Sequence, residues 1–144
     1  TLWDGLVELA PPIHDGYHLP PHVSGRDSGQ PERQIRHGHI FVHDGRIHMT
    51  FSRIGDAPER CLHCEVAPAD DWANWRFGPV SDLLRPAPGW EGGDLPMRPS
   101  IMGTAWDRLH ELRDPALFTD NGQVYVAYCG GAESGLGIAR LDGL

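Results

Sequence analysis

The sequence predicts an all-β protein built from antiparallel strands that are joined by tight turns. Two short stretches, residues 43–45 (HDG) and 120–122 (DNG), have sequences that are typical of the tight turns of β-hairpins. Each is followed by a run rich in β-branched and aromatic residues, 46–52 (RIHMTFS) or 123–129 (QVYVAYC). The 144 residues also include 13 prolines and 18 glycines, which favours short elements and many turns.

Both hairpins belong to an internal repeat. Residues 36–66 resemble residues 113–141, and from Arg36 and Arg113 to Phe51 and Tyr128 the two copies align at a constant offset of 77, so that Gly45 matches Gly122. In each copy a strand, a hairpin turn, a second strand, a loop rich in glycine and acidic residues, and a third strand follow one another. The stretch DWANWRFGPVSDLLRP (71–86) between the copies can supply a fourth, outer strand.

Four antiparallel strands that recur along a chain predict the blades of a β-propeller. Within 36–144 the repeat units near 36–85 and 113–144 amount to about two blades, and residues 1–35 read as a loop-rich segment. Two blades cannot close a ring, and their open faces would expose apolar surface. We therefore expect part of a larger propeller, completed by a partner chain or by N-terminal blades outside this chain.

The charge and hydropathy argue against two classes of partner. The formal net charge is −8, so the chain has no basic surplus with which to displace counterions from nucleic acid. No apolar run approaches the ~20 residues that a helix needs to span a bilayer. We expect a soluble domain that binds neither nucleic acid nor a membrane.

The cysteines bear on the compartment and on metal binding. Cys61, Cys64 and Cys129 are odd in number and lack the spacing of a disulfide scaffold, which favours a reducing compartment such as the cytoplasm. The chain begins at Thr1 rather than Met, so secretion stays open and the localisation unassigned. In a strand, residues three apart point to opposite faces, so Cys61 and Cys64 are expected to fill the core rather than to bind zinc together.

Three longer sequence segments resemble segments of a known protein superfamily. They are RHGHIFVHDGRIHMTFSRIGDAPER (36–60), LLRPAPGWEGGDLPMRPS (83–100) and LRDPALFTDNGQVYVAYCGGAESGLGIARL (112–141). They are similar to the C-terminal part of five-bladed propeller proteins related to family 43 glycoside hydrolases, a superfamily that includes arabinanases, xylosidases, invertases and levansucrases. The resemblance implies an active site in a funnel on the propeller axis, lined by acids from different blades. It implies the fold more strongly than the reaction.

Asp114 lies in an Arg-Asp-Pro motif at the start of a predicted inner strand. The resemblance to invertases implies that its carboxylate holds sugar hydroxyls and stabilises a positively charged transition state. Arg113 would keep this carboxylate ionised through its charge and contribute to substrate binding. The alternative is a loop Asp-Pro turn with an exposed ion pair.

Glu133 is a long acidic side chain between glycines, in GGAESG (130–135), where the backbone can approach a ligand closely. A carboxyl on a dry funnel wall can stay protonated and act as a general acid. The equivalent loop of the first copy holds Asp56, expected to be catalytic, and Glu59, expected to bind substrate together with Arg53. The alternatives are a solvated glutamate and a surface ion-pair network.

His37 and His39 lie two apart in a predicted strand and are expected to share one face. Arg36 matches Arg113 and His37 matches Asp114 in the repeat, which places Arg36 and His37 at the axis as substrate-binding candidates. The histidines could instead bind a divalent metal on the axis or fill a polar core, so metal ligands stay unassigned. No other cofactor is expected.

The loop between the copies contains Trp90, Glu91 and Asp94 in the phrase GWEGGDLP. An indole ring can stack on the apolar face of a pyranose while carboxylates accept hydrogen bonds from hydroxyls, so these residues are candidates for substrate binding. The alternative is a tryptophan packed under its own loop. Three further tryptophans are expected to be structural: Trp72, Trp75 and Trp106.

These residues support three hypotheses about function. The first is a glycoside hydrolase-like propeller that acts on a carbohydrate, such as a polysaccharide fragment, through axial carboxylates. The second is a propeller that binds carbohydrate without catalysis. The third is a metal-dependent lyase or hydrolase that uses His37 and His39. The sugar, the linkage and the stereochemical outcome are not determined by the sequence.

Overall fold

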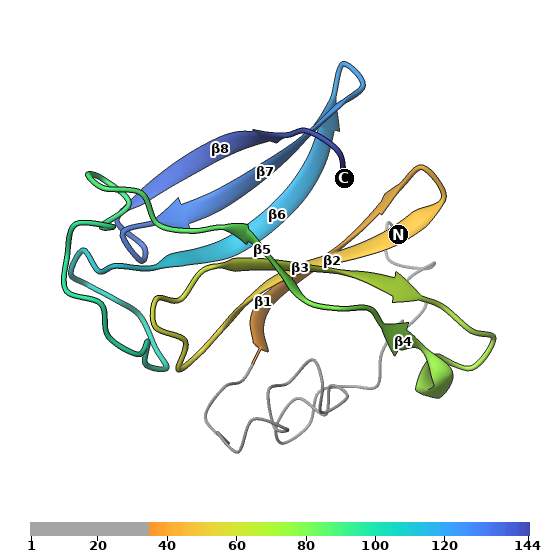
Figure 1. Cartoon of the computed structure of the whole chain (residues 1–144), viewed down its shortest axis with the longest axis horizontal. Coiled ribbons are helices and arrows are strands. Elements are labelled where there is room, and N and C mark those ends of the chain that lie inside the picture. The colour runs from red at the N-terminus through yellow and green to blue at the C-terminus, as the bar shows by residue number, and fades with distance from the viewer. Residues whose placement is uncertain (1–34) are drawn as a thin grey trace, which may run out of the picture.

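A computed structural model of the chain describes residues 35–144, which form two antiparallel β-sheets and a single turn of 3-10 helix, η2, at Trp72–Asn74 (Figure 1). The predicted all-β fold is confirmed. The predicted N-terminal segment 1–35 lies outside the described residues apart from Ile35. The strands are β1 Ile35–His43, β2 Arg46–Arg53, β3 Cys61–Ala67, β4 Arg76–Phe77, β5 Ser81–Leu84, β6 Leu112–Asp120, β7 Gln123–Gly130 and β8 Gly135–Leu141.

The first sheet is an antiparallel meander of β1, β2 and β3, and its outer edge is completed by two short strands. Both β4 and β5 pair with β3, at opposite ends of that strand. Gly78, between them, donates its N–H to the carbonyl of Glu65 (2.8 Å). β4 and β5 together therefore form the predicted fourth, outer strand, which is interrupted between them.

The second sheet is formed by β6, β7 and β8 in sequential antiparallel order. Within the described residues it has three strands, so four strands per unit are seen only in the first sheet. Both predicted hairpins form. Asp44 and Gly45 have φ angles of 46° and 73°, and Asn121 and Gly122 have 48° and 74°. Two successive positive φ angles are typical of the type I′ turn, which explains the Asp-Gly and Asn-Gly sequences.

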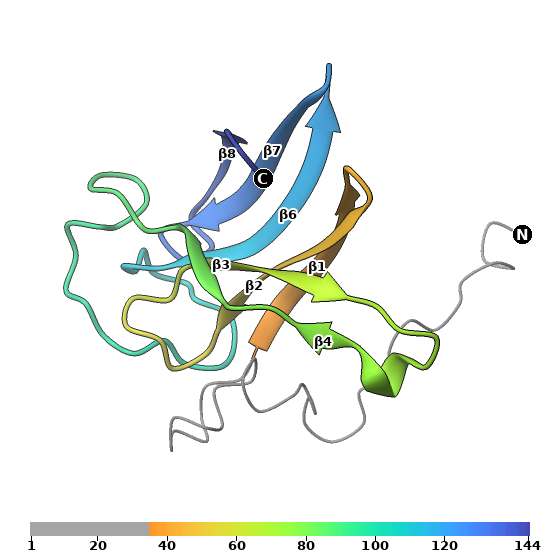
Figure 2. The ribbon, with the colours of Figure 1, turned by 45° about the vertical axis from the view of Figure 1, so that its right-hand side comes forward.

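The two sheets pack face to face, with the inner strands β1 and β6 against each other (Figure 2). Between the sheets lies a cluster of buried side chains: Cys61, Leu112, Leu117, Val124, Val126 and Tyr128, with Phe41 packed against it. A second cluster covers the opposite face of the first sheet: Ile35, Met49, Phe51, Leu62, Cys64 and Val66. No helix in residues 35–144 is long and apolar enough to cross a membrane.

Cys61 and Cys64 point to opposite faces of β3, as strand geometry predicts, and belong to different core clusters. Both thiols are free and buried. Burial raises the pKa of Cys64 to about 11 and also raises the pKa of Cys61. A buried thiol with a raised pKa is a poor nucleophile, so these two residues contribute to packing.

Candidate functional site: a pocket where the inner strands begin

Equivalent bulges interrupt the two inner strands. The pairing register shifts between Arg36 and His39 in β1, and between Arg113 and Ala116 in β6. Within the bulges, His37 and Asp114 have φ angles of 53° and 52°. A left-handed backbone is unusual for residues other than glycine and is found often at functional sites.

The two bulged residues contact each other. His37 Nδ1 lies 2.5 Å from Asp114 Oδ1, and the side chains are 40% and 35% exposed. The hydrogen bond from His37 lowers the pKa of Asp114, although burial opposes it; a hydrogen bond from the Cys129 thiol lowers it further. Asp114 is therefore an ionised carboxylate that remains open to solvent on one side.

Arg113, beside Asp114, is completely buried and binds two glutamates. Its Nε and Nη2 donate to Glu111 Oε2 (2.9 and 2.6 Å), and its Nη1 donates to Glu133 Oε1 (2.8 Å). Burial alone would lower the pKa of Arg113, but the charges of Glu111 and Glu59 and the hydrogen bond to Glu133 outweigh it, so the pKa is raised. The guanidinium thus stays charged and fixes the position of Glu133, whose side chain is 31% exposed.

Arg36 repeats this arrangement in the first sheet. Its Nε and Nη2 donate to the two carboxylate oxygens of Glu59 (2.7 and 2.5 Å), a bidentate pair. Glu59 is fully buried, and its Oε2 also lies 3.9 Å from Arg113 Nε. The predicted substrate-binding residue Glu59 therefore lies beneath the surface and holds Arg36.

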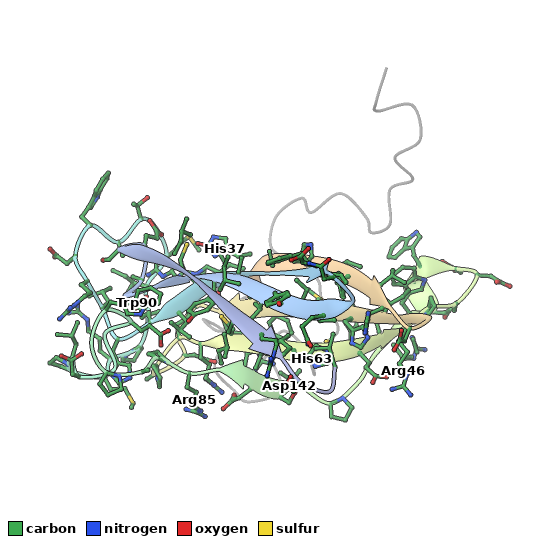
Figure 3. All side chains as sticks on the ribbon, turned by 90° about the horizontal axis from the view of Figure 1, so that it is seen from above. His37, Arg46, His63, Arg85, Trp90 and Asp142 are labelled. Carbon is green, nitrogen blue, oxygen red and sulfur yellow. The ribbon has the colours of Figure 1, made fainter. Side chains whose placement is uncertain are left out.

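A pocket of about 330 Å³ lies over these arginines. Its polar side is formed by Arg36, His37 and Glu133, and its apolar side chains are Ile35, Ile54 and Met102. A pocket with both an apolar wall and a few polar groups is typical of small-molecule sites. In Figure 3, His37 lies on the side of the molecule where Trp90 is labelled, whereas Arg46 lies at the opposite end.

Two predicted residues of the first repeat's loop do not line this pocket. Asp56 is 1% exposed, and its Oδ2 accepts a hydrogen bond from Arg60 Nη1 (2.7 Å). The guanidinium carbon of Arg53 lies 5.5 Å from the ring centroid of Phe51, a cation–π contact. The loop therefore contributes Ile54 to the pocket, while the acid that matches Glu133 in the repeat is buried.

The loop that carries Trp90 packs on the second sheet. The Trp90 ring stacks on Tyr128 with centroids 6.0 Å apart, and it covers Gly130 so closely that a Cβ there would lie 2.5 Å from the indole. Glu91 accepts hydrogen bonds from the Tyr128 hydroxyl (2.5 Å) and from the N–H of Ala87 (2.7 Å). These contacts favour the alternative in which Trp90 and Glu91 hold a loop in place.

Asp94, in the same loop, is exposed and accepts a hydrogen bond from the N–H of Gly89 (3.0 Å). This backbone hydrogen bond lowers the pKa of Asp94. Asp94 lies outside the pocket lining. Its contact stabilises the turn at residues 89–94, as short acidic side chains commonly do.

The expectation that Trp106 is structural is wrong, because this side chain is 91% exposed. Trp72 is 50% exposed, whereas Trp75 packs against the first core cluster and donates its indole N–H to the carbonyl of Ala69 (3.0 Å). Sequence reasoning also missed Glu111, the main partner of Arg113. The only sequence feature that pointed to this pairing is the position of Glu111 two residues before Arg113.

The sequence predicts that His37 and His39 share one face; although the bulge lies between them, both side chains contact β6 of the second sheet, His37 through Asp114. His39 points toward the second sheet, where its Nδ1 accepts the N–H of Leu117 (3.1 Å), and burial lowers its pKa. Among residues 35–144 no group of three or more histidine, cysteine, aspartate or glutamate side chains could hold a metal ion. The described residues therefore provide no ligand set for the metal-dependent hypothesis.

The fold and the site together define a class: an all-β protein of two antiparallel meanders, with a polar pocket where the inner strands begin. A protein of Acanthamoeba polyphaga mimivirus, "Uncharacterized protein R118", is 36% identical to the chain over 108 residues. These residues are 74% of this chain, and the chain spans only 30% of the viral protein. No protein-family description and no solved structure matches the chain.

Proposed function

We propose that the chain supplies two blades of a glycoside hydrolase-like propeller, related to the family 43 superfamily, and that its pocket binds a carbohydrate. One observation carries the proposal: the partly exposed carboxylates of Asp114 and Glu133 flank the buried Arg113 at the start of an inner strand. Glu133 lines the pocket and Asp114 contacts His37 of its lining. Carboxylates in or next to a pocket suit the hydroxyl groups and the positively charged transition state of a sugar.

The polar residues of the pocket lining, and Asp114, which lies outside the lining but contacts His37, each have a role in this proposal. Asp114, kept ionised by His37, accepts hydrogen bonds from sugar hydroxyls and stabilises positive charge at the reacting carbon. Glu133 delivers a proton to the leaving oxygen when hydrolysis occurs. Arg36 and His37 provide further hydrogen-bond donors, and the apolar wall contacts the C–H face of the ring.

A second candidate, carbohydrate binding without hydrolysis, is favoured by the contact between Arg113 and Glu133. A glutamate oxygen 2.8 Å from a guanidinium is placed to accept hydrogen bonds, whereas a general acid must donate a proton. The buried position of Asp56 also removes an acid that the hydrolase hypothesis expected in the site.

Calorimetric titration with mono- and oligosaccharides, combined with release of phenol from aryl glycosides, tests both candidates. Turnover that is lost in Asp114→Asn and in Glu133→Gln supports the hydrolase. Sugar binding without turnover, lost in Asp114→Asn, supports the binding protein. Binding of no sugar by the wild-type chain would overturn both candidates.

The proposed propeller also needs further blades, and the two-sheet unit has open apolar faces for them. On the second sheet, Phe118, Leu136 and Ile138 are 38%, 83% and 67% exposed. Phe118 matches Phe41 in the repeat, and Phe41 packs into the cluster between the sheets. By this equivalence, the outer face of β6–β8 would pack against another sheet of the same kind.

Light scattering and binding of an apolar dye to the chain test this part of the proposal. We expect self-association or strong dye binding, and both should fall when Leu136 and Ile138 are changed to Lys. A stable monomer that binds no dye would contradict it. The matched part is 30% of the viral relative, which leaves length for further blades in that protein.

A further inference from the structure

We propose that the free edge of β1 is a docking surface for a further antiparallel β-sheet, one that presents a hydrogen-bond acceptor to the N–H of Ile40 and a hydroxyl group to the carbonyl of Gly38. The inference rests on the propeller part of the proposed function. It names the partner at the end of the two-sheet unit that lies opposite to the outer face of β6–β8. The molecule itself contains an example of such docking, because the equivalent edge of β6 is covered by the first sheet (Figure 2).

β6 is an edge strand of the second sheet, and two of its backbone groups are bound by side chains of the first sheet. The N–H of Leu117 donates to His39 Nδ1 (3.1 Å), and the carbonyl of Pro115 accepts a hydrogen bond from the Thr50 hydroxyl (3.1 Å). His39 and Thr50 lie directly opposite each other on β1 and β2, so one cross-strand pair provides both groups. The edge of β6 therefore has these polar groups satisfied without a further strand.

β1 presents the same two groups at its own free edge. The pairing of β1 with β2 around Ile40 matches the pairing of β6 with β7 around Leu117, and the bulge lies at the equivalent place. Because the register is the same, the N–H of Ile40 and the carbonyl of Gly38 point away from β2. Within residues 35–144, neither group has a hydrogen-bond partner.

The side chains at the two edges differ in burial as this difference in cover predicts. Leu117 is 4% exposed and belongs to the cluster between the sheets, whereas Ile40, at the equivalent position, is 42% exposed. Val42, two residues further along the same face of β1, is 65% exposed. The edge of β1 thus combines two unpaired backbone groups with apolar side chains, and the same combination at the edge of β6 is covered by a neighbouring sheet.

The second sheet of another copy of this chain matches the edge of β1 only in part. The cross-strand pair equivalent to His39 and Thr50 is Ala116 and Ala127, and a methyl group neither donates nor accepts a hydrogen bond. A copy docked through this face would bury the two backbone groups of β1 without partners, which is costly. The partner is therefore a sheet whose equivalent pair carries an acceptor and a hydroxyl, as β1 and β2 do.

Hydrogen exchange, measured residue by residue and corrected for intrinsic rates, compares the two edges in the wild-type chain. The chain is studied at a concentration where light scattering gives a monomer. We expect the amide of Ile40 to exchange at least about tenfold faster than that of Leu117, because only the Leu117 N–H is hydrogen-bonded. Equal protection of the two amides in the monomer would show that other residues of this chain cover the edge, and would overturn the proposal.

A second experiment gives the outer face of the second sheet the pair that it lacks. Ala116→His combined with Ala127→Thr copies the pair of the first sheet. Ala116→Phe combined with Ala127→Val is the matched control, since its side chains are similar in size but form no hydrogen bonds. In sedimentation we expect the first double variant to self-associate roughly tenfold more tightly than the control, and the Ile40 amide to become protected in the complex.

Two further outcomes would overturn the proposal. Equal self-association of the two double variants, or protection of the Ile40 amide in a wild-type oligomer, would show that apolar contact alone is sufficient. The exchange experiment needs no substitution, so it decides the question if a double variant fails to fold. Neither Ile40 nor the two alanines line the pocket, so sugar titrations test the carbohydrate site separately. Dye binding by the Leu136 and Ile138 variants tests the outer face of β6–β8 in the same independent way.

Discussion

His37 and Asp114 occupy the same position in the two copies of the repeat, and their side chains are joined by a contact of 2.5 Å. Both residues sit in a bulge with a left-handed backbone, at φ angles of 53° and 52°. Because β1 packs against β6, the two bulges bring a histidine and an aspartate together where two aspartates would repel each other. The contact between His37 and Asp114 therefore forms because the two copies of the repeat carry different residues at this position.

Asp114→Asn should abolish carbohydrate binding and lower stability at neutral pH by a modest, measurable amount, because the ionised carboxylate and its contact with His37 are lost. Asparagine has the same shape and tolerates the left-handed backbone, but it lacks the charge that the proposed site requires. Calorimetry with the panel of sugars and a thermal melt measure the two effects. Retention of wild-type sugar affinity in Asp114→Asn would show that the His37–Asp114 pair has a structural role only.

Acid should weaken the contribution of Asp114 to stability. Its pKa is held below the ordinary value of 3.8, so its ionised form stabilises the fold above about pH 4. This stabilisation is lost as the pH falls through the lower pKa of the folded state. Urea unfolding of wild type and Asp114→Asn between pH 2 and 6 should give curves that converge toward the acid end. A constant difference across this range would contradict the lowered pKa.

Replacing Arg113 with Met should destabilise the fold by about 3–5 kcal/mol, because the change leaves Glu111 as a buried, uncompensated charge, while Glu59 keeps its pair with Arg36. Arg140→Met is the matched control, since Arg140 contacts Asp142 at the surface and its side chain is 61% exposed. The control should change stability by less than about 0.5 kcal/mol. Equal effects of the two substitutions in urea unfolding would show that the buried network is not needed for stability.

Gly130→Ala should destabilise the fold by about 1–3 kcal/mol and displace the Trp90 ring, since a Cβ would lie 2.5 Å from the indole. Denaturation and tryptophan fluorescence report these effects. In a Trp90→Ala background, Gly130→Ala should lower the free energy of unfolding by less than it does in the wild type. A double-mutant cycle measures this difference. Gly78→Ala is the control, because its Cβ would meet no atom closer than 3.4 Å. Additive effects of Gly130→Ala and Trp90→Ala would argue against the contact.

The histidine pair of the first sheet should make stability fall between pH 7 and 5. His48 Nδ1 lies 3.0 Å from His63 Nε2, and burial, together with the charge of His48, lowers the pKa of His63 below 6.5. The unfolded chain then binds more protons than the folded chain, so stability decreases as the pH falls from about 6.5 toward the folded pKa. His63→Gln should flatten this part of the curve in urea titrations. A wild-type stability that is constant from pH 7 to 5 would contradict the shift.

The sequence by itself determined the elements and their pairing. The β-branched runs, the Asp-Gly and Asn-Gly turns and the 77-residue repeat predicted both hairpins, because hairpin turns require local φ angles that few residue types adopt. The alternation of side chains in a strand was also enough to separate Cys61 from Cys64. These features depend on neighbours within a few residues, which a linear sequence displays directly.

Only the tertiary structure decided which acidic residues are exposed and which are buried. Glu59 and Asp56 look like Glu133 in sequence, yet burial against arginines removes the first two from the pocket. The same holds for the tryptophans, because Trp90 meets glycines on distant strands, whereas Trp106 meets no comparable surface. Burial and charge pairing depend on contacts between residues far apart in the chain, and neither composition nor local pattern contains that information.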